Sequence, residues 1–173
     1  MKIVVISGSP RKQAVTQVMM KFVYEYAKSK NPDTKFINLS EGTVDCYKGY
    51  DVTYSATTTQ AAKDIMDADV WLIGTPIYNS FFSAALKNLF EYVNYKQTAG
   101  KTAGLAILAS GQIGFTDVQT LLTQLMTYFR IITNPKAVFM TVDQIKENVI
   151  DESSQARLKE LVDETIRLAS RPK

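Results

Sequence analysis

The sequence predicts an α/β fold in which a parallel sheet is covered by helices on both faces. Short apolar runs typical of buried strands alternate along the chain with longer stretches that repeat apolar residues at helical spacing. Strand–helix–strand units cross over with one hand, which makes successive strands parallel and distributes the helices over the two faces. The 173 residues, 46% of them hydrophobic, suffice for a single domain over 1–173 with its own core.

The first strand is predicted at 3–6, where Ile3-Val4-Val5-Ile6 form an apolar run. A helix over 14–29 follows, because its apolar residues fall on one stripe of 3.6-residue period. The second strand, 35–39, alternates apolar and polar residues, as strands nearer a sheet edge do. The same criteria predict later strands at 70–73, 103–109 and 137–142 and later helices at 59–67, 82–95, 116–128 and 153–169.

Five parallel strands separated by helices suit the order 2-1-3-4-5, which is that of a flavodoxin-like three-layer sandwich. In such sheets, ligands bind beyond the carboxyl ends of the strands, at the switch point between strands 1 and 3. The loops that follow Ile6, Ile73 and Leu108 are therefore where a site is expected.

The loop after the first strand has the composition of an anion site. Ser9 and Thr16 supply hydroxyls, and Arg11 supplies a positive charge. The helix that begins near residue 14 adds free N–H groups. Because Ser, Gly and Pro are also ordinary turn residues, this loop alone leaves a polar strand-to-helix turn as the alternative.

The loop after the third strand, 74–83, combines an aromatic side chain, an amide and a proline that stiffens the turn. A planar heterocycle could lie against it. The alternative is a helix N-terminus with core aromatics, and for Phe82 and Phe90 the helical spacing favours this alternative. Tyr78 and Asn79 precede that stripe and stay candidates for ligand contact.

The loop after the fourth strand contains Gly111 and Gly114, which permit close approach of the backbone to a flat ligand. By itself, this loop could be an ordinary turn. It supports a ligand site because it should emerge at the same sheet edge as the other two loops.

Composition excludes several functions. The chain has no histidine, which excludes catalytic triads and imidazole zinc sites. A net charge of +3, dispersed among acidic residues, argues against nucleic-acid binding. No apolar run is long enough to span a membrane, and Cys46 has no second cysteine to pair with, so a cytoplasmic location is expected. Asp64, Asp67 and Asp69 are interpreted as a solvated helix end and turn, with no metal.

Three groups of residues together carry a family resemblance: Gly8-Ser9-Pro10-Arg11-Lys12 with Thr16, Thr75-Pro76-Ile77-Tyr78-Asn79 with Ala85-Leu86-Lys87-Asn88, and Ser110-Gly111-Gln112-Ile113-Gly114. They resemble the NAD(P)H-dependent FMN reductases of flavodoxin-like fold. The resemblance extends from the first strand to about residue 142. Within this family, the sequence most resembles the flavin reductases that supply reduced FMN to two-component monooxygenases. Quinone and azo reductases are relatives.

The resemblance implies FMN as cofactor and NADPH or NADH as the reductant that transfers hydride to it. Electrons would then pass to a small-molecule or protein acceptor, or reduced flavin would leave. No catalytic side chain or metal is implied. A flavodoxin-like electron carrier that accepts no hydride is the alternative, and a domain that has lost its flavin is a third possibility.

The resemblance also assigns the site residues. Ser9, Arg11 and Thr16 would hold the FMN phosphate. The isoalloxazine and ribityl chain would be flanked by Pro76, Ile77, Tyr78 and Asn79, and the flavin edge would be hydrogen-bonded by Ser110, Gly111, Gln112 and Gly114.

Two expectations concern the surroundings of this site. Residues 42–58 should form a long irregular loop that borders the flavin. The predicted helix 82–95 has a second apolar face, made of Phe81, Ala85, Tyr92 and Tyr95, which predicts a homodimer or homotetramer.

Overall fold

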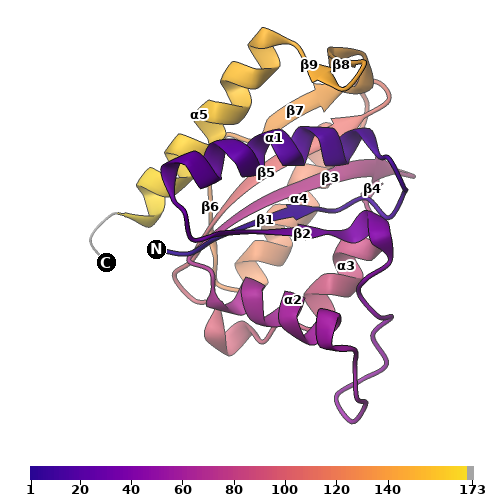
Figure 1. Ribbon diagram of the computed structural model, residues 1–173, viewed down its shortest axis with the longest axis vertical. Helices are drawn as coiled ribbons and strands as arrows, with labels where there is room; N and C mark the ends of the chain where they lie inside the picture. Colours follow the sequence, from indigo (N-terminus) through magenta and orange to yellow (C-terminus); the bar gives the residue numbers. More distant parts are fainter. Residues whose placement is uncertain (171–173) are drawn as a thin grey trace.

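A mostly parallel sheet forms the centre of the computed structural model, which describes residues 1–170 (Figure 1). Within that part of the chain, the strand order is β2-β1-β3-β5-β6, with β7 also paired to β5 and β4 paired to β3. The strands of this sheet are β1 (Ile3–Ser7), β2 (Thr34–Asn38), β3 (Val70–Tyr78), β4 (Phe81–Phe82), β5 (Thr102–Ala109), β6 (Ile132–Thr133) and β7 (Val138–Thr141).

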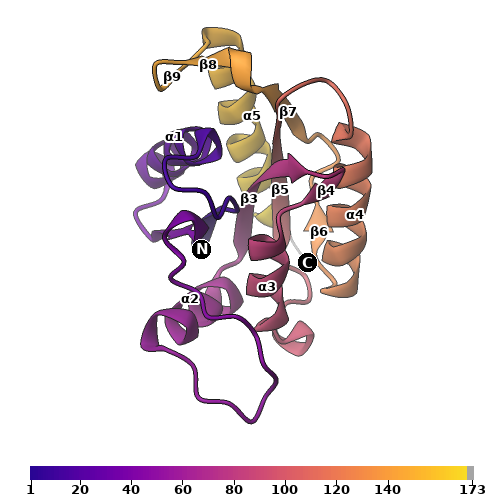
Figure 2. The same ribbon diagram turned by 90° about the vertical axis from the view of Figure 1, so that its right-hand side faces the viewer.

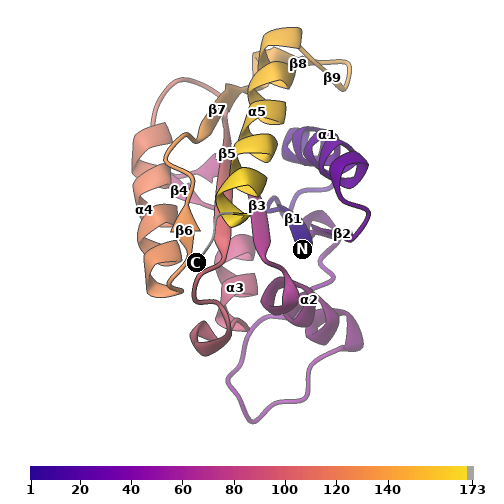
Figure 3. The same cartoon turned by 90° about the vertical axis from the view of Figure 1, so that its left-hand side faces the viewer.

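Helices cover both faces of the sheet (Figures 2 and 3). They are α1 (Val15–Lys30), α2 (Ala56–Asp67), α3 (Ala84–Glu91), α4 (Phe115–Tyr128) and α5 (Glu152–Ala169). The alternation of side chains along β1 divides the core in two. Val4 and Ile6 pack with residues of α2, α3 and α4, whereas Ile3 and Val5 pack with residues of α1 and α5. The predicted three-layer arrangement is therefore confirmed.

The central strands run in the same direction toward one edge of the sheet, and β3 continues to Tyr78, so that Gly74 to Tyr78, predicted as the start of a loop, belong to the strand. In the parallel register Ser7 is opposite Gly74, and Gly74 is opposite Ala106. The loops after β1, β3 and β5 therefore leave the sheet side by side, as the predicted strand order requires.

The predicted order 2-1-3-4-5 holds, and the predicted strand 137–142 is present as β7, but the described sheet has seven strands where five were predicted, because β4 and β6 are added. Both β6 and β7 pair in parallel with β5. Between them, Asn134 is buried and its N–H donates to the Ala103 carbonyl, while Pro135 has no N–H to continue the ladder. The short strand β6 is therefore separate from β7, and the sequence did not predict it.

The predicted helix 82–95 is wrong at both ends. Asn79 and Ser80 take left-handed backbone conformations, with φ of 49° and 64°, so the chain turns and β4 pairs antiparallel with the end of β3. Ser83 then caps α3, and a separate 3-10 turn, Tyr95–Gln97, begins at the Asn94 cap. The apolar spacing that predicted 82–95 thus included the last residue of β4 at one end and the first residue of the 3-10 turn at the other.

A small hairpin and several 3-10 turns complete the fold. The hairpin, β8 (Ile145–Lys146) with β9 (Val149–Ile150), was not predicted, and it lies beside the start of α1 (Figure 1). The 3-10 turns are η1 (Leu39–Glu41), η2 (Tyr95–Gln97) and η3 (Val142–Gln144). Among residues 1–170, no helix combines the length and apolar character needed to span a membrane.

Candidate functional site

A cavity of about 480 Å³ opens at the carboxyl edge of the sheet, where the three predicted loops meet. Its volume lies within the range of about 300–1,000 Å³ that is usual for cofactor sites. The structure brings seven of the predicted site residues to its wall: Ser9, Arg11, Thr16, Pro76, Ile77, Tyr78 and Ser110.

The first loop presents hydroxyls and N–H groups to this cavity. Ser9 and Thr16 are buried, and the Ser9 hydroxyl lies 3.0 Å from the hydroxyl of Tyr78. Ala14 occupies the N-cap position of α1 and provides no side-chain acceptor, whereas the N-termini of α2, α3 and α5 are capped by Ser55, Ser83 and Asp151. The Gln17 N–H donates to the Ala14 carbonyl at 2.8 Å, and the N–H groups of Val15 and Thr16 are left for an acceptor from outside the chain.

Two further features, one in the first loop and one at the end of β1, also indicate a ligand. Gln13 holds a φ of 52°, a conformation that costs energy for a residue with a side chain and that often marks a functional loop. At the end of β1, the buried hydroxyl of Ser7 has no hydrogen-bond partner within residues 1–170. A buried polar atom without a partner is costly unless a ligand or water satisfies it.

The charge of the cavity favours an anion. Arg11 and Lys12 lie on its wall and are exposed. No aspartate or glutamate belongs to the wall as the structure describes it. Two positive charges with no carboxylate on the described wall favour a positive potential at the mouth.

Ser83 fixes the path of the first loop, a role that the sequence did not reveal. Its hydroxyl donates to the Gly8 carbonyl and accepts from the Leu86 N–H at 3.1 Å. Its own N–H donates to the Thr75 hydroxyl at 3.2 Å. One buried residue thus joins the first loop, the end of β3 and the N-terminus of α3, its side chain bonding the first and last and its backbone N–H the second. The available signal was a serine immediately before a helical stripe, but the predicted helix already included that position.

Gly8 allows the first two loops to come this close. Its N–H donates to the Gly74 carbonyl at 2.8 Å, and a Cβ at residue 8 would lie 2.6 Å from that same oxygen. Real Cβ atoms essentially never come so close to another heavy atom. The glycine is therefore required by the close approach of the two strands.

The second loop divides its residues between two hollows. Tyr78 lines the cavity and also a neighbouring hollow of about 890 Å³. Asn79, at the tip of the β3–β4 turn, lines only the second hollow. Tyr47 and Phe81 give that hollow an aromatic character.

The third loop contributes less to the cavity than predicted. Ser110 lies on its wall, but Gly111, Gln112 and Gly114 do not. Gly114 is the N-cap of α4 and has a φ of 85°, and its position lies close against Ile77 of the second loop. As at α1, the cap provides no side-chain acceptor. The helix N-terminus after this loop is therefore also open toward the same sheet edge.

Several residues on the cavity wall were not predicted. Leu108 and Ala109 are the last residues of β5, and their place just before Ser110 could have indicated them. Val142, which follows β7, carried no signal in the sequence. The other additions belong to the first loop and the start of α1: Lys12, Gln13, Ala14 and Val15.

The irregular loop, which spans 42–55 because α2 already begins at Ala56, is tied to α3. The Asp45 carbonyl accepts hydrogen bonds from Asn88 and from the Tyr92 hydroxyl, both at 2.8 Å. The ring of Tyr92 meets those of Tyr47 and Tyr54 at centroid distances of 5.2 and 4.8 Å. Burial raises the pKa of both Tyr47 and Tyr92 to about 12.

This packing changes the interpretation of the predicted second apolar face. Tyr92 is covered by the chain's own loop, Ala85 packs against the core, and Tyr95 meets Tyr128 at 5.8 Å. Phe81 is the member that stays half exposed, at 50%. The face that suggested an oligomer is thus largely occupied from within the chain.

Known proteins resemble this chain in sequence and in fold. A family model described as NADPH-dependent FMN reductase matches residues 1–145, which include all three loops of the cavity. An NAD(P)H-dependent FAD/FMN reductase of Geobacillus thermodenitrificans strain NG80-2 is 24% identical over 139 residues, covering 79% of this chain and 75% of the relative. An NADH-dependent FMN reductase, SfnF, of Pseudomonas putida is 24% identical over 173 residues, covering 95% and 90%. The solved apo structure of an NADH:FMN oxidoreductase, EMOB, has the same fold, with a TM-score of 0.81 at 18% identity, covering 99% of this chain and 91% of that one.

Proposed function

The chain belongs to the NADPH-dependent FMN reductase family, and from that premise we propose that the cavity between its three loops holds the phosphate end of FMN. The protein reduces FMN at the expense of NADPH or NADH. Family membership favours this activity over the electron carrier that the sequence left as an alternative. The proposal concerns which residues bind the flavin and how.

The observation that carries the proposal is the uncapped N-terminus of α1 above two buried hydroxyls. The N–H groups after Ala14, together with the Ser9 and Thr16 hydroxyls, offer several donors to one anion. Arg11 lies beside them and can form a charge-assisted pair with a phosphate oxygen. The donor set therefore fits a phosphate monoester better than a neutral ligand.

The second and third loops supply what a planar ring needs. Pro76 and Ile77 present an apolar wall next to the phosphate end, and Tyr78 connects this wall to the wider hollow. Asn79 can hydrogen-bond the ring from that hollow. Ser110, Gly111, Gln112 and Gly114 would reach the opposite edge of the ring, Ser110 from the cavity wall and the others from outside it.

When bound, the flavin supplies the chemistry, because it accepts hydride from the nicotinamide and passes electrons to a second acceptor. The chain itself binds, orients and shields. Arg11 and the α1 N-terminus hold the phosphate, while Ile77 and Leu108 exclude water from the apolar wall. No acid or base from the chain is needed for a hydride transfer.

The electron acceptor and the assembly belong to the same proposal. The aromatic hollow beside Tyr78 suits a flat small-molecule acceptor that approaches the exposed part of the flavin. Phe81, half exposed on its rim, offers a contact to a second copy of the chain. We expect a homodimer or homotetramer, and light scattering that shows a monomer at micromolar concentration would contradict this.

Titration of FMN into purified variants tests the site. Arg11→Ala removes one charge-assisted contact to the phosphate and should raise the Kd for FMN about tenfold or more. Asn79→Gly keeps the left-handed turn and removes only the amide, so it should weaken FMN binding without unfolding the hairpin. Lys96→Ala, an exposed cation in the turn that precedes β5, is the matched control. An unchanged affinity for FMN in both site variants would refute the assignment.

A further inference from the structure

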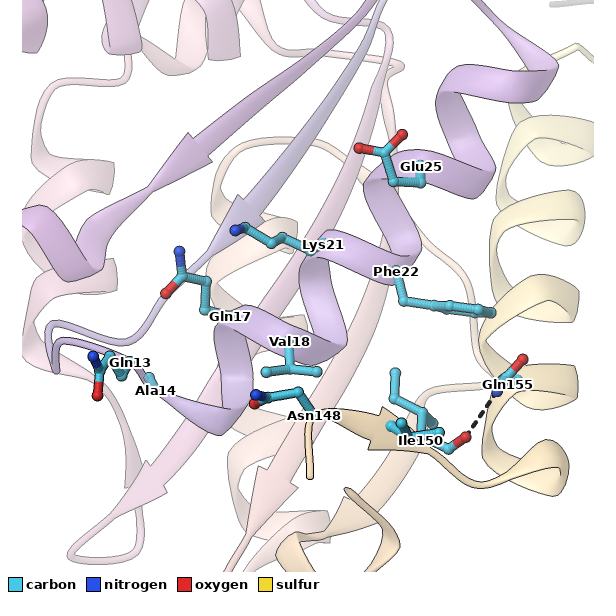
Figure 4. Close-up of a pocket in the computed structure, with 11 residues that line it drawn as sticks. Gln13, Ala14, Gln17, Val18, Lys21, Phe22, Glu25, Asn148, Ile150 and Gln155 are labelled. Carbon is cyan, nitrogen blue, oxygen red and sulfur yellow. Dashed lines mark hydrogen bonds between the residues drawn. The ribbon is translucent and has the colours of Figure 1, made fainter. Parts of the chain in front are cut away.

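A second groove lies along α1, between this helix and the β8–β9 hairpin (Figure 4). Its volume is about 920 Å³. Val18 of α1 points toward Asn148 of the hairpin and Phe22 toward α5. Val149 of the hairpin also lines the groove. The groove is therefore larger than the cavity assigned to the flavin phosphate.

The groove and the flavin cavity are neighbours at one particular point. Gln13 and Ala14 line both of them. These residues lead into the α1 N-terminus, where the FMN phosphate is proposed to bind. A ligand that continues beyond that phosphate would therefore enter the groove directly.

We propose that this groove binds the adenylate half of FAD, so that the same site accepts FAD as well as FMN. The inference rests on the proposed function, because it takes the position of the flavin phosphate from it. FAD differs from FMN by an adenylate attached to that phosphate. The adenylate is attached to the flavin phosphate, and this phosphate is proposed to lie where the flavin cavity meets the groove along α1.

The wall chemistry of the groove suits a nucleotide. Val18, Phe22 and Val149 form an apolar surface for the flat base, and Val149 is 65% exposed although it is part of a strand. Gln17 and Asn148 offer amide donors and acceptors to the base edge and the ribose hydroxyls.

The charged side chains along the groove are also arranged to suit a nucleotide, with positive charge near the proposed phosphate site. Arg11 and Lys12 lie on the flavin cavity, and Lys21 lies on the groove wall two helical turns into α1. Glu25, the carboxylate of the wall, comes one turn later, farther from the proposed phosphate. A pyrophosphate near Gln13 would therefore meet positive charge before it meets negative charge.

The groove is preformed, because the hairpin is held in place. Gln155 of α5 donates to the Ile150 carbonyl at 2.7 Å, as Figure 4 shows. Glu147 and Asn148 make the tight turn with φ of 50° and 63°. A wall that is already fixed loses little entropy when a ligand binds.

The nicotinamide dinucleotide is the rival occupant. Its reactive ring must face the isoalloxazine, which lies toward Tyr78 and the aromatic hollow in the proposed arrangement. The groove opens instead at the phosphate end of the flavin. This position favours the adenylate of FAD over that of the nicotinamide nucleotide.

Equilibrium titrations with FMN and FAD test the inference by binding, without turnover. The wild-type protein should bind FAD at least as tightly as FMN. The double variant Lys21→Glu with Val149→Glu places two carboxylates on the groove wall and should raise the Kd for FAD about tenfold or more, with the Kd for FMN changed by less than about twofold. Lys28→Glu makes the same charge change as Lys21→Glu, on α1 but outside the groove, and should alter neither value.

The outcomes separate this inference from the proposed function. If FMN binds but the wild-type protein binds FAD much more weakly, or if the double variant binds FAD as Lys28→Glu does, the adenylate does not lie in the groove. If the double variant weakens binding of NADPH or NADH and leaves both flavins unchanged, the groove belongs to the nicotinamide nucleotide and the inference is wrong. If neither flavin binds to the wild-type protein, it is the proposed function that fails.

Discussion

Replacing Gly8 by alanine should destabilise the protein at the point where the first two loops touch. The added Cβ would lie 2.6 Å from the Gly74 carbonyl oxygen and 3.4 Å from the Leu86 side chain. The first contact is with backbone, which cannot turn aside as a flexible side chain can. The two strand ends must therefore move apart.

The cost can be worked out from that geometry. Separating the Cβ and the oxygen to an ordinary contact distance also stretches the Gly8 N–H bond to the same oxygen, which is 2.8 Å long. Overpacking costs about 1–3 kcal/mol and a lost hydrogen bond about 0.5–1.5 kcal/mol. Reduced entropy of the unfolded chain offsets about 0.4–1 kcal/mol. Together these terms give a fall in the free energy of unfolding of about 0.5–4 kcal/mol, with a central value of about 2 kcal/mol.

Urea unfolding without flavin measures this effect. With a slope of about 1–3 kcal/mol per molar urea, the midpoint should fall by about 1 M. Gly111→Ala is the matched control, because no heavy atom lies within 4 Å of a Cβ built there, and its change should stay within about 0.5 kcal/mol. If Gly8→Ala were as stable as Gly111→Ala, the close approach inferred for the loops would be wrong.

Three further predictions concern Ser83 and the irregular loop that is packed on α3. Ser83→Ala should lower the free energy of unfolding by about 1–3 kcal/mol and weaken FMN binding, since it leaves a buried carbonyl and a helix N–H without partners; unchanged urea and FMN titrations would contradict this. Hydrogen bonds from Ser55 lower the pKa of Asp45, so its support of the loop should be lost as pH falls through that pKa, and Asp45→Asn should speed tryptic cleavage after Lys48 at neutral pH. Because the pKa of Tyr47 and Tyr92 is raised to about 12, the stability from their packing should decline between about pH 10 and 12; tyrosinate absorbance already complete at pH 11 would argue against it.

The apolar runs made the architecture predictable. The apolar run Ile3-Val4-Val5-Ile6 predicted a buried strand, and the stripe from Val15 to Tyr26 predicted a helix packed on a sheet, as the structure has them. The strand order then followed from the alternation of elements, and with it the edge at which the loops meet. These features depend on which side chains are buried, and the spacing of apolar residues in the sequence indicates this directly.

The sequence predictions failed where the conformation of a few backbone residues determines the path of the chain. Asn79 and Ser80 reverse the chain without glycine, and so do Glu147 and Asn148 in the missed hairpin. Such turns carry little signal in a single sequence. For the same reason the part of the site that depends on loop geometry was predicted least well: Ser110 reaches the cavity wall, whereas the residues after it do not.

The most direct test of the account is protein-dependent reduction of FMN. Purified protein and FMN are mixed without oxygen, NADPH or NADH is added, and the loss of oxidised-flavin absorbance is compared with a protein-free mixture and with Arg11→Ala at the same flavin concentration. The account predicts rapid bleaching with the wild-type protein and slower bleaching with the variant until FMN is raised toward saturation. FMN that is demonstrably bound but reduced no faster than in the protein-free mixture, with either nicotinamide, would contradict it.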